Sequence, residues 1–150
     1  MKRAILLGLG ALGVSAAAIP AIAVAQGFPP PPPATFYGTV PSGVVPGQGV
    51  IAIVTNGSAS ATCGAGIVST DGSATVYVVD VVADAQQTGC GKAGAKVSFY
   101  FTPTSGGGGR LATDTFDWNG AGPANKNITN LGSALTRRGA GILLAKDGTS

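Results

Sequence analysis

One long apolar stretch near the N-terminus is followed by short runs in which apolar and polar residues alternate. The clearest run places Val97, Phe99 and Phe101 on one side and Ser98 and Tyr100 on the other. A period of two residues is typical of a β-strand with one buried face. The pattern therefore predicts a strand here, with the three apolar side chains inside and Tyr100 exposed.

Turn residues separate this run from others like it. Asn56-Gly57, Asp71-Gly72 and Asn119-Gly120 supply residues that tolerate the positive φ of a tight turn. Strands are expected over 35–40, 50–55, a short run toward 63, 66–70, 74–82, 97–101, 111–118 and 127–131. No amphipathic helix is evident, and a single sheet would leave its apolar face in water. We therefore predict an all-β fold, an antiparallel two-sheet sandwich of about seven strands.

The run 74–82 carries valines on both faces. Tyr77 and Val79 belong to one face, whereas Val76 and Val78 belong to the other. A sandwich covers only one face of each strand. The second face is either exposed or covered by a loop or the tail, and the sequence leaves this choice open.

The N-terminal stretch predicts export. Lys2 and Arg3 precede an uncharged apolar segment that ends at Ala23-Val24-Ala25, the order expected of a cleaved signal peptide. An uncleaved anchor is the alternative, because the segment is about long enough to cross a bilayer. No later segment is apolar enough to span one. We divide the chain into a signal peptide (1–25), a proline-rich linker (26–34), a β-sandwich domain (35–132) and a C-terminal tail (133–150).

The basic charge belongs largely to the signal. The chain has 9 Lys and Arg against 6 Asp, and removal of Lys2 and Arg3 leaves 7 against 6, a net +1. The remaining basic residues are scattered, whereas nucleic-acid binding requires a basic stripe. We therefore expect no nucleic-acid partner. The five prolines from Pro29 to Pro33 predict a stiff polyproline II spacer, and recognition as a proline-rich ligand is the alternative.

Two cysteines remain in the exported domain. Cys63 and Cys90 are predicted to form a structural disulfide, the usual state of paired cysteines outside the cytoplasm. A metal site would need more ligands, and the chain has neither histidine nor a CxxC motif. We expect no metal and no cofactor.

The residues needed for catalysis are scarce. Without histidine, neither a Ser-His-Asp nor a Cys-His arrangement can form. Glutamate is also absent, so paired carboxylates would have to come from six aspartates; Asp80 and Asp84 are the pair nearest a strand end, where a calcium site is conceivable. Solvated surface aspartates are the simpler interpretation. The sequence predicts a protein that is not an enzyme.

Aromatic residues are the best candidates for ligand binding, because exposed flat rings can stack on sugars. The candidate binding residues are Tyr100, Trp118 and Tyr37. Trp118 shares strand parity with Phe116, which favours a position in the core. Tyr100 is expected to be the most exposed ring.

Several glycines and core positions together resemble a known family of modules. These positions are Phe36-Tyr37-Gly38-Thr39-Val40, Pro46-Gly47, Val50-Ile51-Ala52, Cys63-Gly64, Asp71-Gly72 with Tyr77, Gly89-Cys90, 94–99 and Trp118-Asn119-Gly120. The stretch 36–121 resembles the carboxypeptidase-regulatory-like, transthyretin-like modules of exported bacterial proteins. It departs from their pattern after Tyr77, where Val78 to Val82 follow without the usual short spacing before a proline. The resemblance implies a transthyretin-like sandwich, with an immunoglobulin-like one as the alternative, and an accessory role in spacing, adhesion or polysaccharide binding.

The expected function follows from these points. We predict a secreted or cell-surface bacterial module with a structural or adhesive role, whose partner is an extracellular or cell-surface protein or polysaccharide. The alternative is a polysaccharide-binding accessory module. In the tail, the apolar run 141–145 is a candidate edge strand.

Overall fold

The computed structural model describes residues 29, 31–105 and 108–135, and within them every regular element is a β-strand. The predicted signal peptide, most of the tail and the candidate strand at 141–145 lie outside the described residues. In the described part, no helix is long and apolar enough to cross a membrane. The strands are β1 (Ala34–Thr39), β2 (Gly49–Asn56), β3 (Ala59–Asp71), β4 (Ala74–Val81), β5 (Lys96–Phe101), β6 (Gly109–Asp117), β7 (Gly122–Asn125) and β8 (Leu131–Leu135).

Most predicted strands are confirmed to within a few residues. The hairpin turns at Asn56-Gly57 and Asp71-Gly72 are also confirmed, with glycine φ angles of 61° and 58°. Two expectations were wrong. The separate runs before and after Cys63 form one long strand, β3, and the predicted strand at 127–131 is replaced by β7 and β8 on either side of an irregular segment.

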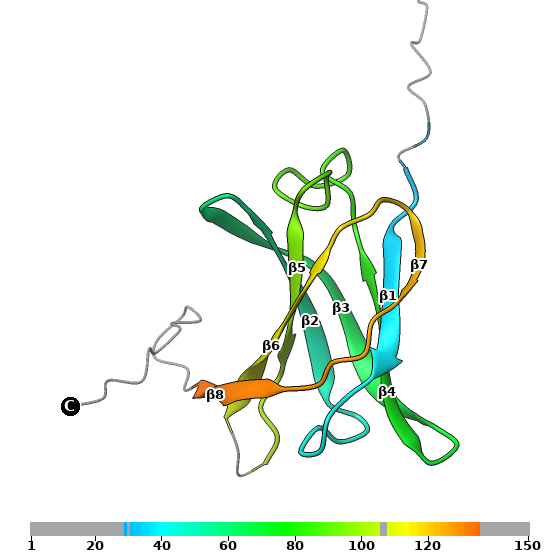
Figure 1. Ribbon diagram of the computed structural model, residues 1–150, viewed down its shortest axis with the longest axis vertical. Helices are drawn as coiled ribbons and strands as arrows, with labels where there is room; N and C mark the ends of the chain where they lie inside the picture. Colours follow the sequence, from blue (N-terminus) through cyan, green and yellow to red (C-terminus); the bar gives the residue numbers. More distant parts are fainter. Residues whose placement is uncertain (1–28, 30, 106–107, 136–150) are drawn as a thin grey trace, which may run out of the picture.

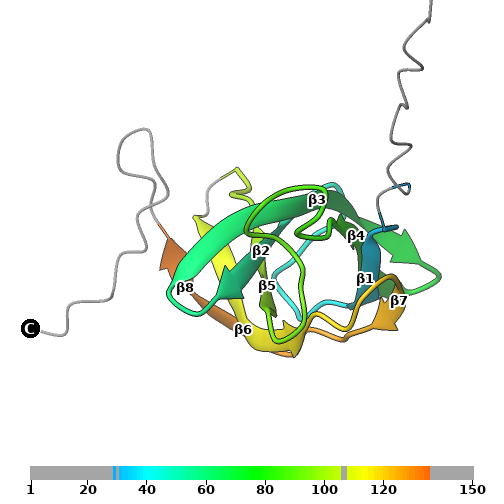
Figure 2. The same cartoon turned by 90° about the horizontal axis from the view of Figure 1, so that it is seen from above.

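The strands form one continuous sheet instead of the two predicted. Its order is β7-β1-β4-β3-β2-β5-β6-β8, and every pair is antiparallel except β1 with β7. The sheet is strongly curled, because Tyr77 of β4 packs on Phe99 of β5 although β3 and β2 lie between them in the sheet; the ring centroids are 4.9 Å apart. Figure 2 shows the strands arranged around a common interior, with β3 opposite β6.

β3 joins the two halves of the curled sheet, because it pairs with β2 along one part of its length and with β4 along the other. Residues 59–67 pair with β2, whereas Val68 to Asp71 pair with β4. At Gly64 and Gly66, a side chain would collide with the backbone carbonyl groups of Asp80 and Val78 in β4. Glycine lets the two backbones approach closely at this crossing. These glycines allow one strand to serve both halves of the sheet.

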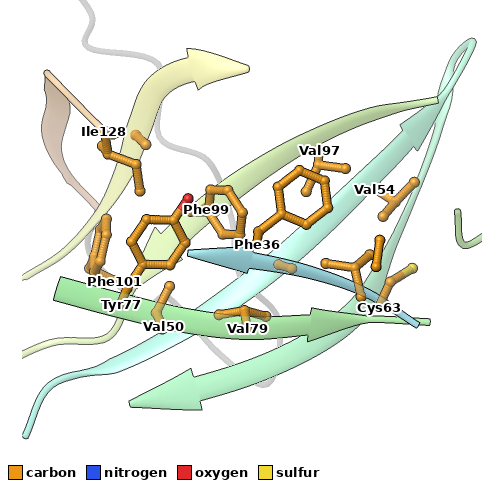
Figure 3. Packing of buried hydrophobic residues seen from close by; sticks show 14 of the residues in the cluster. Phe36, Val50, Val54, Cys63, Tyr77, Val79, Val97, Phe99, Phe101 and Ile128 are labelled. Carbon is orange, nitrogen blue, oxygen red and sulfur yellow. The ribbon is translucent and has the colours of Figure 1, made fainter. Parts of the chain in front are cut away.

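The core fills the inside of the curl (Figure 3). Phe99 lies at its centre and contacts three other rings, those of Phe36, Tyr77 and Phe116, with centroids 4.9 to 6.1 Å apart. Valines from β2, β4 and β5 surround this aromatic cluster and are fully buried. In the run 74–82, the face that carries Tyr77, Val79 and Val81 is the buried one.

Residues 126–130, which we call the strap, join β7 to β8 and close the gap between β1 and β6 (Figure 1). On one side, the amide of Lys126 donates to the carbonyl of Tyr37 at 2.7 Å and that of Ile128 to the carbonyl of Thr39 at 2.9 Å. On the other side, the strap is held by Asp114 of β6. Ile128 inserts its buried side chain into the core.

Candidate functional site

The predicted disulfide is confirmed, with Cα atoms 5.5 Å apart. Cys63 lies where the β2–β3 register shifts, so that it has no partner residue in β2, and a bulge of this kind re-aims a side chain. The bond fixes the loop 82–95 against β3. The side-chain amide of Asn56 reinforces it by donating to the carbonyls of Gly89 and Cys90, at 2.8 and 3.2 Å.

The described carboxylates serve the fold at separate places. Asp80 accepts a hydrogen bond from the Thr35 hydroxyl at 2.6 Å, and Asp84 accepts one from the amide of Gly89 at 2.7 Å. Within the described ranges, no group of three or more His, Cys, Asp or Glu residues is arranged to hold a metal ion. Asp80 and Asp84 thus each hold a different segment, β1 and the disulfide loop.

Asp114 has the most distinctive electrostatic environment. Desolvation alone would raise its pKa, but hydrogen bonds from the Thr129 amide (2.7 Å), the Asn130 amide (3.1 Å) and the Thr129 hydroxyl outweigh this and lower the pKa below its usual value. Burial raises the pKa of Tyr77 well above its ordinary range, and the negative charge of Asp114 adds to the effect. The Tyr77 hydroxyl donates a hydrogen bond to the Lys126 carbonyl at 2.7 Å. Both side chains thus fasten the strap.

The prediction that Tyr100 is exposed was wrong, because only 8% of it is accessible. Its ring lies against Gly109 of β6, where any added side chain would collide with the phenol. Its register partners in β2 and β6 are Ile51 and Leu111, both half-buried. Because the adjacent strand has a glycine here, the Tyr100 ring lies against the outer face of the sheet. The ring is therefore too buried to serve as a stacking platform for a sugar.

Trp118 is half-buried. It packs against the core, as its parity with Phe116 predicts, and its indole covers Gly91 of the disulfide loop. Trp118 also lines a separate depression, together with Ala93, Gly94, Asn119 and Gly120. Its buried Nε1 has no hydrogen-bond acceptor in the part of the chain described. Trp118 therefore acts as a cover for the loop.

Tyr37 is the candidate that remains at the surface, with 38% of it accessible. Its register partners are Val78 in β4, which is 50% exposed, and Asn125 in β7. Cross-strand partners lie side by side on one face of a sheet. An amide, an aromatic ring and a valine thus form a row across three strands.

This row lies in a shallow depression of about 330 Å³, which we call the Tyr37 groove. Its side chains come mainly from β1, β4 and the segment after β6: Tyr37, Asp71, Val76, Val78, Asn125 and Asn127. The sequence pointed to Tyr37 but not to the two asparagines. The only available signal was the second apolar face of the run 74–82, now seen to be partly exposed. The asparagines are placed by the parallel pairing of β7 with β1 and by the strap, which no local pattern indicates.

The three candidate aromatics are not brought together: Tyr37 and Trp118 line different depressions, and Tyr100 lines neither. Comparisons with protein-family models, curated proteins and solved structures find no match to this chain. The fold and the surface of the domain are therefore the basis for inferring its function.

Proposed function

We propose that this chain is an exported β-module with a structural or adhesive role at or outside the cell surface, and that it acts by binding and not by catalysis. The observation that carries this proposal is the buried bond between Cys63 and Cys90. Disulfides persist in oxidising compartments and are rare in the cytoplasm. The basic and apolar N-terminal segment supports export independently.

A binding role is supported by the distribution of side chains. Hydrogen bonds from Thr35, Gly89 and the strap engage Asp80, Asp84 and Asp114, respectively. Exposed apolar residues, by contrast, gather on the outside of neighbouring strands: Tyr37 on β1, Val78 on β4 and Ile67 on β3. An exposed group of this kind is more typical of a contact surface than of a reaction centre.

We also retain the relation to transthyretin-like modules as a proposal. An all-β domain with a fastened loop and a core contributed by two facing halves is compatible with it. In this proposal, the β1–β4 half and the β2–β5–β6 half act as the two layers of a sandwich that share β3.

Export can be tested by expressing the full chain in a bacterial host, with a variant lacking residues 1–25 as the control. We expect the full chain to appear outside the cytoplasm, cut after Ala25, with both cysteines resistant to alkylation until a reductant is added. The truncated control should remain inside with two reactive thiols. An uncut full chain with free thiols in the cytoplasm would overturn the proposed location.

Binding can be tested by adding the purified, oxidised protein to washed cells of the same host and measuring the fraction that sediments with them. A protein that is exported but does not sediment with cells, with wall fragments or with extracellular polymer would contradict the adhesive role. Polysaccharide binding is the second candidate function, and the exposed Tyr37 ring favours it.

A further inference from the structure

We propose that the Tyr37 groove binds an uncharged polysaccharide chain, with one sugar ring stacked on Tyr37. This inference rests on the proposed binding function and names its site and ligand class. Sugar rings combine apolar C–H faces with hydroxyl groups around their edge. A binding site for them therefore needs an exposed flat apolar surface with hydrogen-bonding groups beside it.

The groove offers this combination in the right order. Tyr37 supplies the ring, and Val78 extends the apolar surface on its β4 side. Asn125 borders the ring on the β7 side, where its amide can both donate to and accept from hydroxyls. The arrangement of an apolar floor with a few polar groups at its edge is typical of small-ligand sites, and about 330 Å³ is within the usual range of ~300–1,000 Å³.

The second asparagine is oriented by the fold. The Oδ1 atom of Asn127 accepts a hydrogen bond from the amide of Thr39 at 3.0 Å. Its Nδ2 group is the donor left for other partners, and Asn127 lines the groove. The fold thus fixes which atom of this side chain can meet a ligand hydroxyl.

The floor of the groove is rigid, which lowers the entropy lost on binding. Tyr37 belongs to a strand that is paired on both sides, with β4 and with β7. Its carbonyl also accepts the Lys126 amide of the strap. Gly38 lies so close to the Lys126 backbone that a side chain there would collide with it. The backbone that carries the ring is therefore held in place before any ligand arrives.

Charge selects among polysaccharides. Among the described residues that line the groove, Asp71 is the only acidic one, and none is basic. A single carboxylate without a basic neighbour in the groove repels uronates and sulfated sugars and leaves neutral chains as the better ligands. Because the groove is shallow and not enclosed, it can take one ring of a long chain while the rest of the chain stays in solvent.

The test uses the oxidised protein after signal removal, with affinity electrophoresis in gels containing soluble hydroxyethyl cellulose, glycol chitin or starch, and polygalacturonate as the anionic comparison. We expect at least one neutral polymer to retard the protein. Tyr37→Ala should weaken that retardation about tenfold, equivalent to about 1.4 kcal/mol. Tyr37→Phe, which keeps the ring, should stay within about threefold of the wild type.

Val45→Ala is the matched control, because this residue is apolar and 47% exposed but does not line the groove. It should leave retardation unchanged, and urea unfolding should show that every variant is folded. Retardation by polygalacturonate alone, by no polymer, or equally for wild type and Tyr37→Ala would overturn the proposal. If the protein is still exported and sediments with cells, such a result refutes this site and leaves the proposed function standing.

Discussion

The packing of Tyr77 against Phe99 provides a direct test of the curled sheet. Their strands, β4 and β5, are separated by β3 and β2 in the hydrogen-bonded order. In a flat sheet, three strand spacings of ~4.8 Å would hold them ~14 Å apart, whereas their ring centroids are 4.9 Å apart. Curling is the only way to bring the two rings into contact.

We therefore predict an energetic coupling between Tyr77→Leu and Phe99→Leu. Each single substitution should cost about 1–3 kcal/mol, because it removes a fully buried ring but leaves an apolar side chain. Tyr77→Leu also removes the hydroxyl bond to the Lys126 carbonyl, but that loss occurs with and without Phe99 and cancels in the cycle. An aromatic pair contributes about 0.5–1.5 kcal/mol beyond its burial, and this is the coupling expected.

The measurement is a double-mutant cycle from urea unfolding of the oxidised protein. As a control, Phe99→Leu is combined with Ile67→Ala, since Ile67 is on the exposed surface and Phe99 is fully buried. These two changes should add to within about 0.3–0.5 kcal/mol. A Tyr77–Phe99 coupling as small as that of the control pair would refute the contact, and with it the curled arrangement.

Three further predictions concern the crossing strand, the strap and the disulfide. Gly66→Ala should lower the free energy of unfolding by more than about 2 kcal/mol in urea titrations, because its Cβ would meet the Val78 carbonyl, whereas Ala65→Val on the exposed side of β3 should change it by less than about 0.5 kcal/mol. Asp114→Asn should destabilise the protein at pH 7. Because the native pKa of Asp114 is lowered, its stabilising contribution is present above the unfolded-state value and is lost as the pH falls through the native pKa. The difference between wild type and variant should therefore shrink below about pH 4, and a constant difference from pH 7 to pH 2 would contradict this account. Cys63→Ser should cost about 3–4 kcal/mol for a separation of 27 residues, measured against the wild type with and without reductant; a variant as stable as the oxidised wild type would show that the bond is not a constraint.

Local patterns were sufficient to predict most of the strands. Alternation placed Phe99 inside, and Asn-Gly and Asp-Gly marked two hairpins correctly, because period and turn chemistry depend only on neighbouring residues. The disulfide was also predictable, since the chain has only two cysteines.

The surface and the joining of the halves depended on contacts between distant segments. Tyr100 has the alternation of an exposed residue but is covered because Gly109 lies beside it in another strand. The glycines of β3 are ordinary in sequence and decisive only where they cross β4. The Tyr37 groove needs Asn125 and Asn127, which are about ninety positions away and are placed by a parallel pairing and by the strap. Sequence determines which face a side chain prefers, whereas the neighbours that cover or complete that face are fixed only when remote strands pack together.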